Sequence, residues 1–159
     1  MAKDWHLGGF RIGKETFGVP IALVHEIVRV PEITAVPDAP SCVEGVINLR
    51  GRIISVVDLR KRFGEKEISR NKKNRILVAE VDGKLVGLVV DAASEVLKIP
   101  AAEIDKPPQV YEENDLNYVT GVGKLHGRLI ILVDLSRIRK PGEVRRLDQF
   151  AGAQAAVVA

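Results

Sequence analysis

The chain repeats itself, and this repeat restricts the possible folds more than any other feature of the sequence. Residues 45–59 align with residues 121–135, and Gly, Val, Leu, Gly, Arg, Ile, Val, Asp and Leu recur in step. Upstream, residues 25–31 align with residues 94–100. Because both matches come in the same order, the sequence predicts two copies of one half-sized unit that pack against each other.

Each copy has the pattern of short β-strands. Runs rich in Val, Ile and Leu are broken by Gly, Pro and Asp, and the pair Asp82-Gly83 is typical of a tight hairpin turn. The spacing predicts strands at residues 7–12, 17–21, 46–49, 53–59, 76–81, 84–90, 118–125 and 129–135. Many short strands at close spacing favour a mainly β sandwich or barrels over a parallel α/β sheet.

Helical spacing is confined to short segments. Val24, Ile27 and Val28 would share one face of a helix over residues 22–28, and residues 92–97 show the same spacing. Each segment runs into a proline, which cannot continue a helix. Residues 143–150 predict a C-terminal helix, and the tail beyond it is expected to fray.

The repeated hairpin carries its own turn and capping signals. Gly51 and Gly127 are expected to supply the positive φ that a tight turn requires. Asp58 and Asp134 end the strands that follow, and we expect each to cap a short helix at residues 59–63 or 135–139.

Composition and targeting signals indicate a soluble cytoplasmic protein. The single cysteine, Cys42, allows no intrachain disulfide, which fits a reducing compartment. The first nine residues lack the apolar core of a signal peptide, and the longest apolar runs fall far short of the ~20 residues that span a bilayer.

The sequence contains no group of residues that indicates catalysis, a cofactor or a metal. Three histidines and one cysteine supply no metal-ligand cluster, and no nucleophile or zinc-protease motif is present. Residues 8–14 have the glycine and lysine spacing of a phosphate loop, but Glu15 stands where the Mg²⁺-binding hydroxyl belongs. We therefore expect a protein that binds other macromolecules and is not an enzyme.

Nucleic acid is the alternative partner. A basic run at residues 60–62 and further cations at residues 70–75 could face phosphates, in the manner of a small basic β-barrel. The formal charge is only +3, however, and aromatic residues for base stacking make up only 4% of the chain. We expect these basic residues to form a solvated connector between the two copies.

Apolar and charged residues near the first repeated hairpin form a candidate binding surface. Val24, Ile27 and Val28 lie beside Glu26, while Asn48, Arg50 and Arg52 lie at the hairpin tip. Arg50 is placed either to contact a partner or to pair with Glu26, and the second copy has Glu95 and His126 at the matching positions. Ordinary surface charges, whose pairs contribute only ~0–1 kcal/mol, explain the pattern equally well.

Residues 45–60, with the turn Asn48-Leu49-Arg50-Gly51, resemble the signature of CheW-like domains, the adaptors of bacterial chemotaxis. Residues 17–21, 24–27, 86–91 and 127–134 resemble the other blocks of this family in the same order. The resemblance covers about residues 7–140. One departure is Ser55, where the family usually has proline.

The resemblance implies a fold and a domain organisation. It implies two five-stranded, SH3-like β-barrels packed together, with short helices, within a single domain at residues 7–140. The first repeat would span about residues 7–68 and the second about residues 74–140, followed by a C-terminal helix and tail at residues 141–159. It also implies that the protein has no catalytic activity and no cofactor.

The resemblance further implies a scaffold that couples transmembrane chemoreceptors to the histidine kinase CheA, recruited to receptor arrays at the inner face of the membrane. The cytoplasmic tip of a methyl-accepting chemoreceptor would dock between the barrels, and the regulatory domain of the kinase would join barrel to barrel. The expected receptor-binding residues are Val24, Glu26, Ile27, Val28, Asn48 and Arg50. The expected kinase-binding residues are Glu26, Asn48, Leu49, Arg50, Gly51 and Arg52.

Overall fold

The protein is built from two β-sheets with a few short helices. The computed structural model describes residues 4–65, 68–107 and 118–138, without the side chains of residues 94, 95 and 138. The strands are β1 (Asp4–Ile12), β2 (Glu15–Pro20), β3 (Val24–Arg29), β4 (Val43–Leu49), β5 (Arg52–Asp58), β6 (Arg75–Val81), β7 (Lys84–Val90), β8 (Ala92–Pro100), β9 (Ile104–Asp105), β10 (Val119–Leu125) and β11 (Arg128–Val133). The helices are η1 (Ile21–Leu23), α1 (Leu59–Arg62), η2 (Ala101–Glu103) and α3 (Leu135–Ile138). The expected mainly β class is confirmed, while the helix predicted at residues 143–150 and the tail at 141–159 lie outside the described residues.

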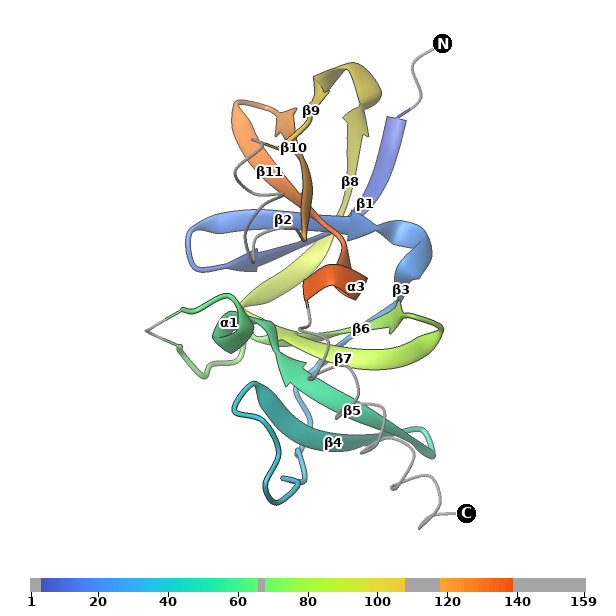
Figure 1. The fold of residues 1–159 in the computed structure, drawn as a ribbon, viewed down its shortest axis with the longest axis vertical. Helices are drawn as coiled ribbons and strands as arrows, with labels where there is room; N and C mark the ends of the chain where they lie inside the picture. Colours follow the sequence, from blue (N-terminus) through green and yellow to red (C-terminus); the bar gives the residue numbers. More distant parts are fainter. Residues whose placement is uncertain (1–3, 66–67, 108–117, 139–159) are drawn as a thin grey trace.

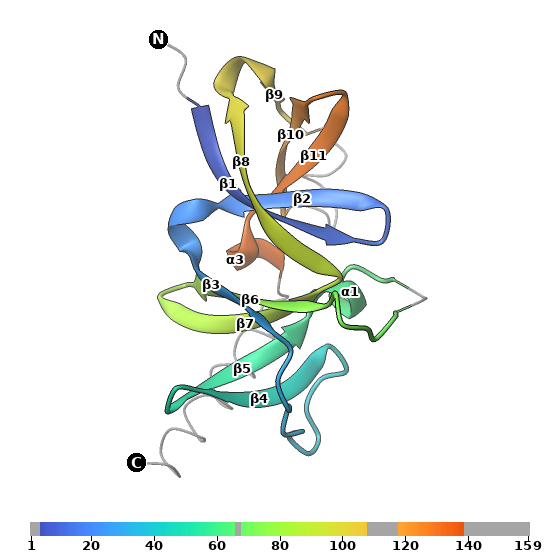
Figure 2. The same cartoon turned by 180° about the vertical axis from the view of Figure 1, so that it is seen from behind.

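The two halves of the chain exchange hairpins. One sheet has the order β8-β1-β2-β11-β10-β9 and the other has the order β3-β6-β7-β5-β4. The β1–β2 hairpin of the first half thus lies among strands of the second half, and the β6–β7 hairpin lies among strands of the first. Figures 1 and 2 show the six-stranded sheet above the five-stranded sheet, with α3 between them.

Strand pairing follows the sequence repeat closely. In each sheet one pair is parallel, β5 with β7 and β11 with β2, and the rest are antiparallel. Val56 lies opposite Gly87 in one parallel pair, and Leu132, the residue aligned with Val56, lies opposite Gly18 in the other. The internal repeat therefore corresponds to an equivalent arrangement of strands in the two sheets.

The five-stranded sheet curls until its two edges meet. The chain leaves edge strand β3 and reaches Thr34, which pairs with Val46 of edge strand β4 through two backbone hydrogen bonds of 2.9 Å. This contact requires a glycine at position 45, because a Cβ there would lie 2.0 Å from the Thr34 carbonyl oxygen. The β9 segment pairs with β10 at the matching place in the other sheet.

The two helices predicted at residues 22–28 and 92–97 are wrong, because both segments are mainly strand. Residues 24–29 form β3 and residues 92–100 form β8. In both strands the pairing skips one residue, His25 against β6 and Ser94 against β1. Such a bulge breaks the alternation of a strand and places residues three apart on one face, which is also the spacing of a helix.

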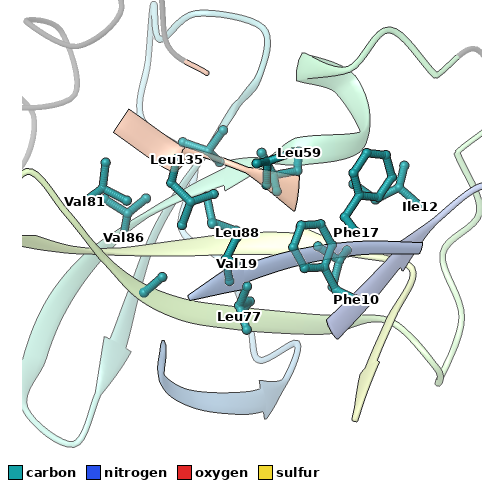
Figure 3. Close-up of a cluster of buried hydrophobic side chains, with 14 of the residues drawn as sticks. Phe10, Ile12, Phe17, Val19, Leu59, Leu77, Val81, Val86, Leu88 and Leu135 are labelled. Atoms are coloured by element: carbon teal, nitrogen blue, oxygen red, sulfur yellow. The ribbon is translucent and has the colours of Figure 1, made fainter. Parts of the chain in front are cut away.

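Buried apolar side chains of the described residues form three clusters. The largest, Phe10, Ile12, Phe17 and their neighbours, comes from both sheets and fills the space between them (Figure 3). A second cluster, including Ile54 and Ile76, comes only from the five-stranded sheet. A third, including Leu7, Leu97 and Ile130, comes only from the six-stranded sheet. Each curled sheet thus has its own core, and a further core joins the two sheets.

Candidate interaction surface

The turn between β4 and β5 has a tightly specified backbone. Arg50 and Gly51 have φ values of 51° and 86°, so both central residues are in the left-handed region, as in a hairpin turn that matches strand twist. Asn48 Oδ1 accepts a hydrogen bond of 2.8 Å from the Gly51 backbone N–H. Asn48 therefore holds the turn that presents Arg50, and the prediction of a positive φ at Gly51 is confirmed.

Arg50 and Glu26 form an ion pair, which confirms the pairing that the sequence left open. The Arg50 guanidinium donates to Glu26 Oε2, and the two side chains are 71% and 29% exposed. Because Glu26 lies on β3 and Arg50 on the β4–β5 turn, the pair joins the two edges of the five-stranded sheet. It fixes the direction of an exposed guanidinium at the rim of that sheet.

The three apolar residues of β3 do not share one face, contrary to the helical interpretation. Val24 and Ile27 pack against the cluster between the sheets, whereas Val28 packs against the separate core of the five-stranded sheet. All three side chains are partly buried. Of the three, Val24 and Ile27 lie on the side that faces the other sheet.

The structure adds Gly8 and Val96 to this surface. Val24 packs closely over Gly8 of β1, since a Cβ at Gly8 would lie 2.8 Å from Val24 Cγ2. Gly8 pairs with Val96 of β8, whose side chain is 62% exposed. An apolar strip therefore runs from β3 across a glycine to β8 and so from one sheet to the other. The one sequence signal for this close approach of β3 to β1 was Gly8, a glycine inside a predicted strand.

The remaining expected kinase-binding residues differ in their exposure. Leu49 is partly buried and packs against the core of the five-stranded sheet, while Arg52, its partner across the hairpin, is exposed. Among the described residues, none beyond the chain neighbours of Gly51 has an atom within 4 Å of the place where a Cβ would project. The exposed residues of this hairpin end are thus Asn48, Arg50, Gly51 and Arg52, while Leu49 packs against the core beneath them.

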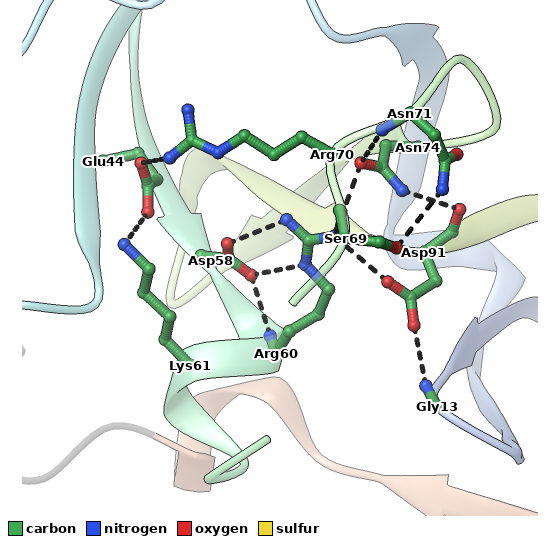
Figure 4. A network of polar contacts seen from close by, with 10 residues as sticks. All are labelled: Gly13, Glu44, Asp58, Arg60, Lys61, Ser69, Arg70, Asn71, Asn74 and Asp91. Carbon is green, nitrogen blue, oxygen red and sulfur yellow. Dashed lines mark hydrogen bonds and ion pairs between the residues drawn. The ribbon is translucent and has the colours of Figure 1, made fainter. Parts of the chain in front are cut away.

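Arg60 is buried, so the prediction of a solvated basic connector is wrong for this residue. Its side chain is 4% exposed and that of Asp58 is 3% exposed. The guanidinium binds the Asp58 carboxylate through Nε and NH2, both at 3.0 Å, and reaches Asp91 Oδ1 at 3.0 Å and the Ser69 carbonyl at 2.6 Å through NH1 (Figure 4). Burial alone would lower the pKa of Arg60, but hydrogen bonds and charges from Asp58 and Asp91 outweigh it and raise that pKa.

Asp58 and Asp134 both have the capping role predicted for them. Asp58 Oδ1 accepts from the Arg60 backbone N–H, and Asp134 Oδ1 accepts from the Ser136 backbone N–H, each at 3.0 Å. Asp58 additionally binds the buried Arg60 guanidinium, whereas Asp134 binds the Ser136 hydroxyl and pairs with the exposed Arg137 at 3.4 Å. Both copies of the repeat thus have the aspartate cap, but only in the first copy does the capping aspartate bind a buried arginine.

The described residues contain neither a cluster of three potential metal ligands nor a helix that could span a membrane. Over residues 4–65, 68–107 and 118–138, no three His, Cys, Asp or Glu side chains come together as a metal site would require. No helix within these same ranges has the length and hydrophobicity needed to cross a membrane. What the geometry offers is an apolar strip that joins the two sheets and, at the β4–β5 turn, a guanidinium held by an ion pair.

Known proteins resemble this chain along most of its length. The model of the CheW-like domain matches residues 6–141. The chain is 33% identical over 142 residues to chemotaxis protein CheW of Klebsiella aerogenes, covering 89% of this chain and 86% of the relative. It is 37% identical over 129 residues to chemotaxis protein CheW of Rhizobium meliloti, covering 81% and 83%.

A solved structure gives the same result for the fold. The crystal structure of the scaffolding protein TtCheW from Thermoanaerobacter tengcongensis matches with a TM-score of 0.79 and 38% sequence identity. The match covers 90% of this chain and 96% of that protein. The sequence and structural comparisons therefore point to the same family.

Proposed function

Since the chain belongs to the CheW-like family, we propose that it is a non-catalytic scaffold that couples transmembrane chemoreceptors to the histidine kinase CheA in bacterial chemotaxis. The observation that carries this proposal is the Asn-Leu-Arg-Gly turn, held by the Asn48 side chain and by the ion pair of Arg50 with Glu26. A surface of this kind suits a protein partner, because it combines a few apolar anchors with an oriented cation.

The receptor tip is a helical hairpin, and its docking place is the apolar strip of Val24, Gly8 and Val96. A helix lays its apolar face into a groove through residues spaced at i, i+3, i+4 and i+7. Val24 packs closely on Gly8, and Val96 is an exposed apolar residue on β8 that a receptor helix can contact. Glu26 of β3 and its ion-pair partner Arg50 are the charged residues that orient the receptor.

The kinase contact is the exposed end of the β4–β5 hairpin. Asn48, Arg50, Gly51 and Arg52 are exposed there; Asn48 also holds the turn, and Leu49 packs against the core beneath it. The regulatory domain of CheA is the partner, bound barrel to barrel. A cytoplasmic location at receptor arrays follows from the same role.

Two SH3-like barrels in one domain, with repeats at about residues 7–68 and 74–140, are the architecture that we propose for this scaffold. The separate core of each curled sheet and the Thr34–Val46 closure support it. The hairpin exchange means that each barrel contains strands from both repeats. Nucleic-acid binding has less support, because Arg60, the first residue of the basic run at 60–62, is buried and forms ion pairs with Asp58 and Asp91.

Binding measurements on the whole chain test the proposal. Titration calorimetry would use two partners, the regulatory domain of CheA and a soluble receptor signalling hairpin. Arg50→Ala is expected to weaken binding of at least one partner by more than about 1 kcal/mol, as for a central interface residue. The matched control is Lys14→Ala, which removes an exposed cation from the β1–β2 turn.

A double-mutant cycle with Glu26→Ala separates positioning from direct contact. Non-additive losses indicate that Glu26 acts by orienting Arg50, whereas additive losses indicate that each residue contacts the partner itself. Wild-type protein that binds neither partner, or binds DNA in a salt-dependent manner instead, would overturn the proposed function.

A further inference from the structure

Asp91 occupies the point at which the chain leaves one sheet and enters the other. Strand β7 ends at Val90 in the five-stranded sheet, and β8 begins at Ala92 in the six-stranded sheet, so Asp91 is the single residue between them. Within the described ranges the chain passes between the sheets twice, and the other passage uses the three residues of η1. A change in backbone direction at Asp91 therefore tilts one sheet against the other.

The Asp91 carboxylate binds a group from each sheet. Its Oδ1 accepts from Arg60 NH1 at 3.0 Å, and Arg60 belongs to α1, which directly follows β5. Its Oδ2 accepts from the Gly13 backbone N–H at 2.7 Å, and Gly13 lies in the β1–β2 turn of the six-stranded sheet. Asn74 Nδ2 also donates to the Asp91 carbonyl at 3.2 Å (Figure 4).

These hydrogen bonds restrict the relative orientation of the two sheets, which the apolar core between the sheets restricts only weakly. Burial of apolar area is non-directional, so the inter-sheet core favours contact over a range of angles. Charge-assisted hydrogen bonds are shorter and stronger than neutral ones, and a carboxylate that receives donors at both oxygens is fixed in orientation. Arg60 is itself held by Asp58, so Asp91 binds to a rigid donor.

We propose that Asp91 is a positioning residue that sets the angle between the two sheets and thereby the spacing of Val96 from Val24. Val96 lies on β8, five residues after Asp91, and Val24 lies on β3 of the other sheet. The inference rests on the proposed function in one respect, namely that a receptor hairpin spans both sheets. The kinase-binding end of the β4–β5 hairpin lies within the five-stranded sheet and does not depend on this angle.

Two variants test the proposal. Asp91→Ala removes both acceptors, whereas Asp91→Asn retains one oxygen for Arg60 and presents an amide donor or a displaced oxygen to Gly13. Both leave the pairing of Arg60 with Asp58 in place. The matched control is Asp105→Ala, which removes an exposed carboxylate of the six-stranded sheet that pairs with Lys124 at 3.6 Å.

Residual dipolar couplings of backbone amides measure the angle directly. One alignment tensor is expected to fit both sheets in the wild type and the control, while the sheets of Asp91→Ala are expected to require a changed relative orientation. Amide hydrogen exchange at Gly13 is expected to accelerate in both Asp91 variants. Affinity for the receptor hairpin is expected to fall about 3–10-fold, as for couplings through packed networks, with kinase-domain affinity changed less than twofold.

The outcomes separate this inference from the proposed function. An unchanged inter-sheet angle in folded Asp91→Ala overturns it, as does an equal loss of affinity for both partners, which indicates general destabilisation. If Asp91→Ala does not fold, the angle and the affinity ratio are read from Asp91→Asn. Wild-type protein that binds no receptor hairpin overturns the proposed function, while the dipolar couplings still decide the role of Asp91 in setting the angle.

Discussion

Removal of the Arg60 side chain is expected to cost much of the protein's stability. In Arg60→Ala, the carboxylate of Asp58 loses both guanidinium contacts at 3.0 Å and keeps one backbone hydrogen bond. Asp58 is 3% exposed, so water does not replace the lost partner. Breaking a buried ion pair by removing one member costs about 3–5 kcal/mol.

This loss is large compared with the total stability of a domain, which is about 5–15 kcal/mol. For a chain of this size each kcal/mol lowers the melting temperature by about 2–4 °C, so the expected decrease is about 6–20 °C. Urea unfolding followed by circular dichroism measures the free energy directly, provided that the dependence on urea stays unchanged. Arg60→Lys is expected to be intermediate, because a lysine keeps the charge but cannot bind Asp58 through two donors.

Arg70→Ala is the matched control, because Arg70 is 81% exposed and lies 3.9 Å from Glu44. Its loss is expected to change the unfolding free energy by less than about 0.5 kcal/mol. A decrease below about 1 kcal/mol for Arg60→Ala would refute the reasoning, since it would mean that the Asp58 carboxylate finds other hydrogen-bond partners.

Three further substitutions probe other parts of the fold by their effect on the free energy of unfolding. Gly45→Ala should destabilise by at least about 2 kcal/mol, and clearly more than Gly127→Ala, because only at position 45 would the Cβ meet a backbone carbonyl; equal losses would contradict the close contact with Thr34. Val24→Asp should lose about 1–3 kcal/mol of stability besides receptor affinity, because Val24 is packed on Gly8 and the inter-sheet core; an unchanged melting temperature would show that the side chain is free to turn into solvent. Ser55→Ala should leave stability unchanged or raise it by about 1 kcal/mol, since the buried Ser55 hydroxyl has no hydrogen-bond partner among the described residues; a loss of stability would reveal one.

The local features of the fold were readable from the sequence because they depend on residues close together in the chain. The turn at Gly51, the caps at Asp58 and Asp134, and the hairpin at Asp82-Gly83 each rest on a few neighbouring residues. The internal repeat also predicted that the strands follow one another in the same order in both halves of the chain. The pairing of Glu26 with Arg50 was foreseen as one of two options, because an acid and a base recur at matching places in both copies.

The missed features depend on contacts between distant segments. Val24 and Ile27 share a core because of a bulge at His25, and the resulting spacing is the same as in a helix. Burial of Arg60 depends on Asp91, 31 residues away, and on the Ser69 carbonyl, neither of which a basic run at residues 60–62 indicates. Exposure of Val96 likewise depends on how the two sheets pack.

The exchange of hairpins between the halves has a consequence for how the chain folds during synthesis. Thr16 of β2 pairs with Ile130 of β11, so the hairpin made first must wait for a strand made 114 residues later. At a translation rate of about 5–20 residues per second, that interval is roughly 6–23 s. During this time β2, which carries the apolar residues Phe17 and Val19, has no partner strand from the second half. The nascent chain therefore emerges with an uncovered hairpin, and this interval is when a ribosome-associated chaperone would have most to protect.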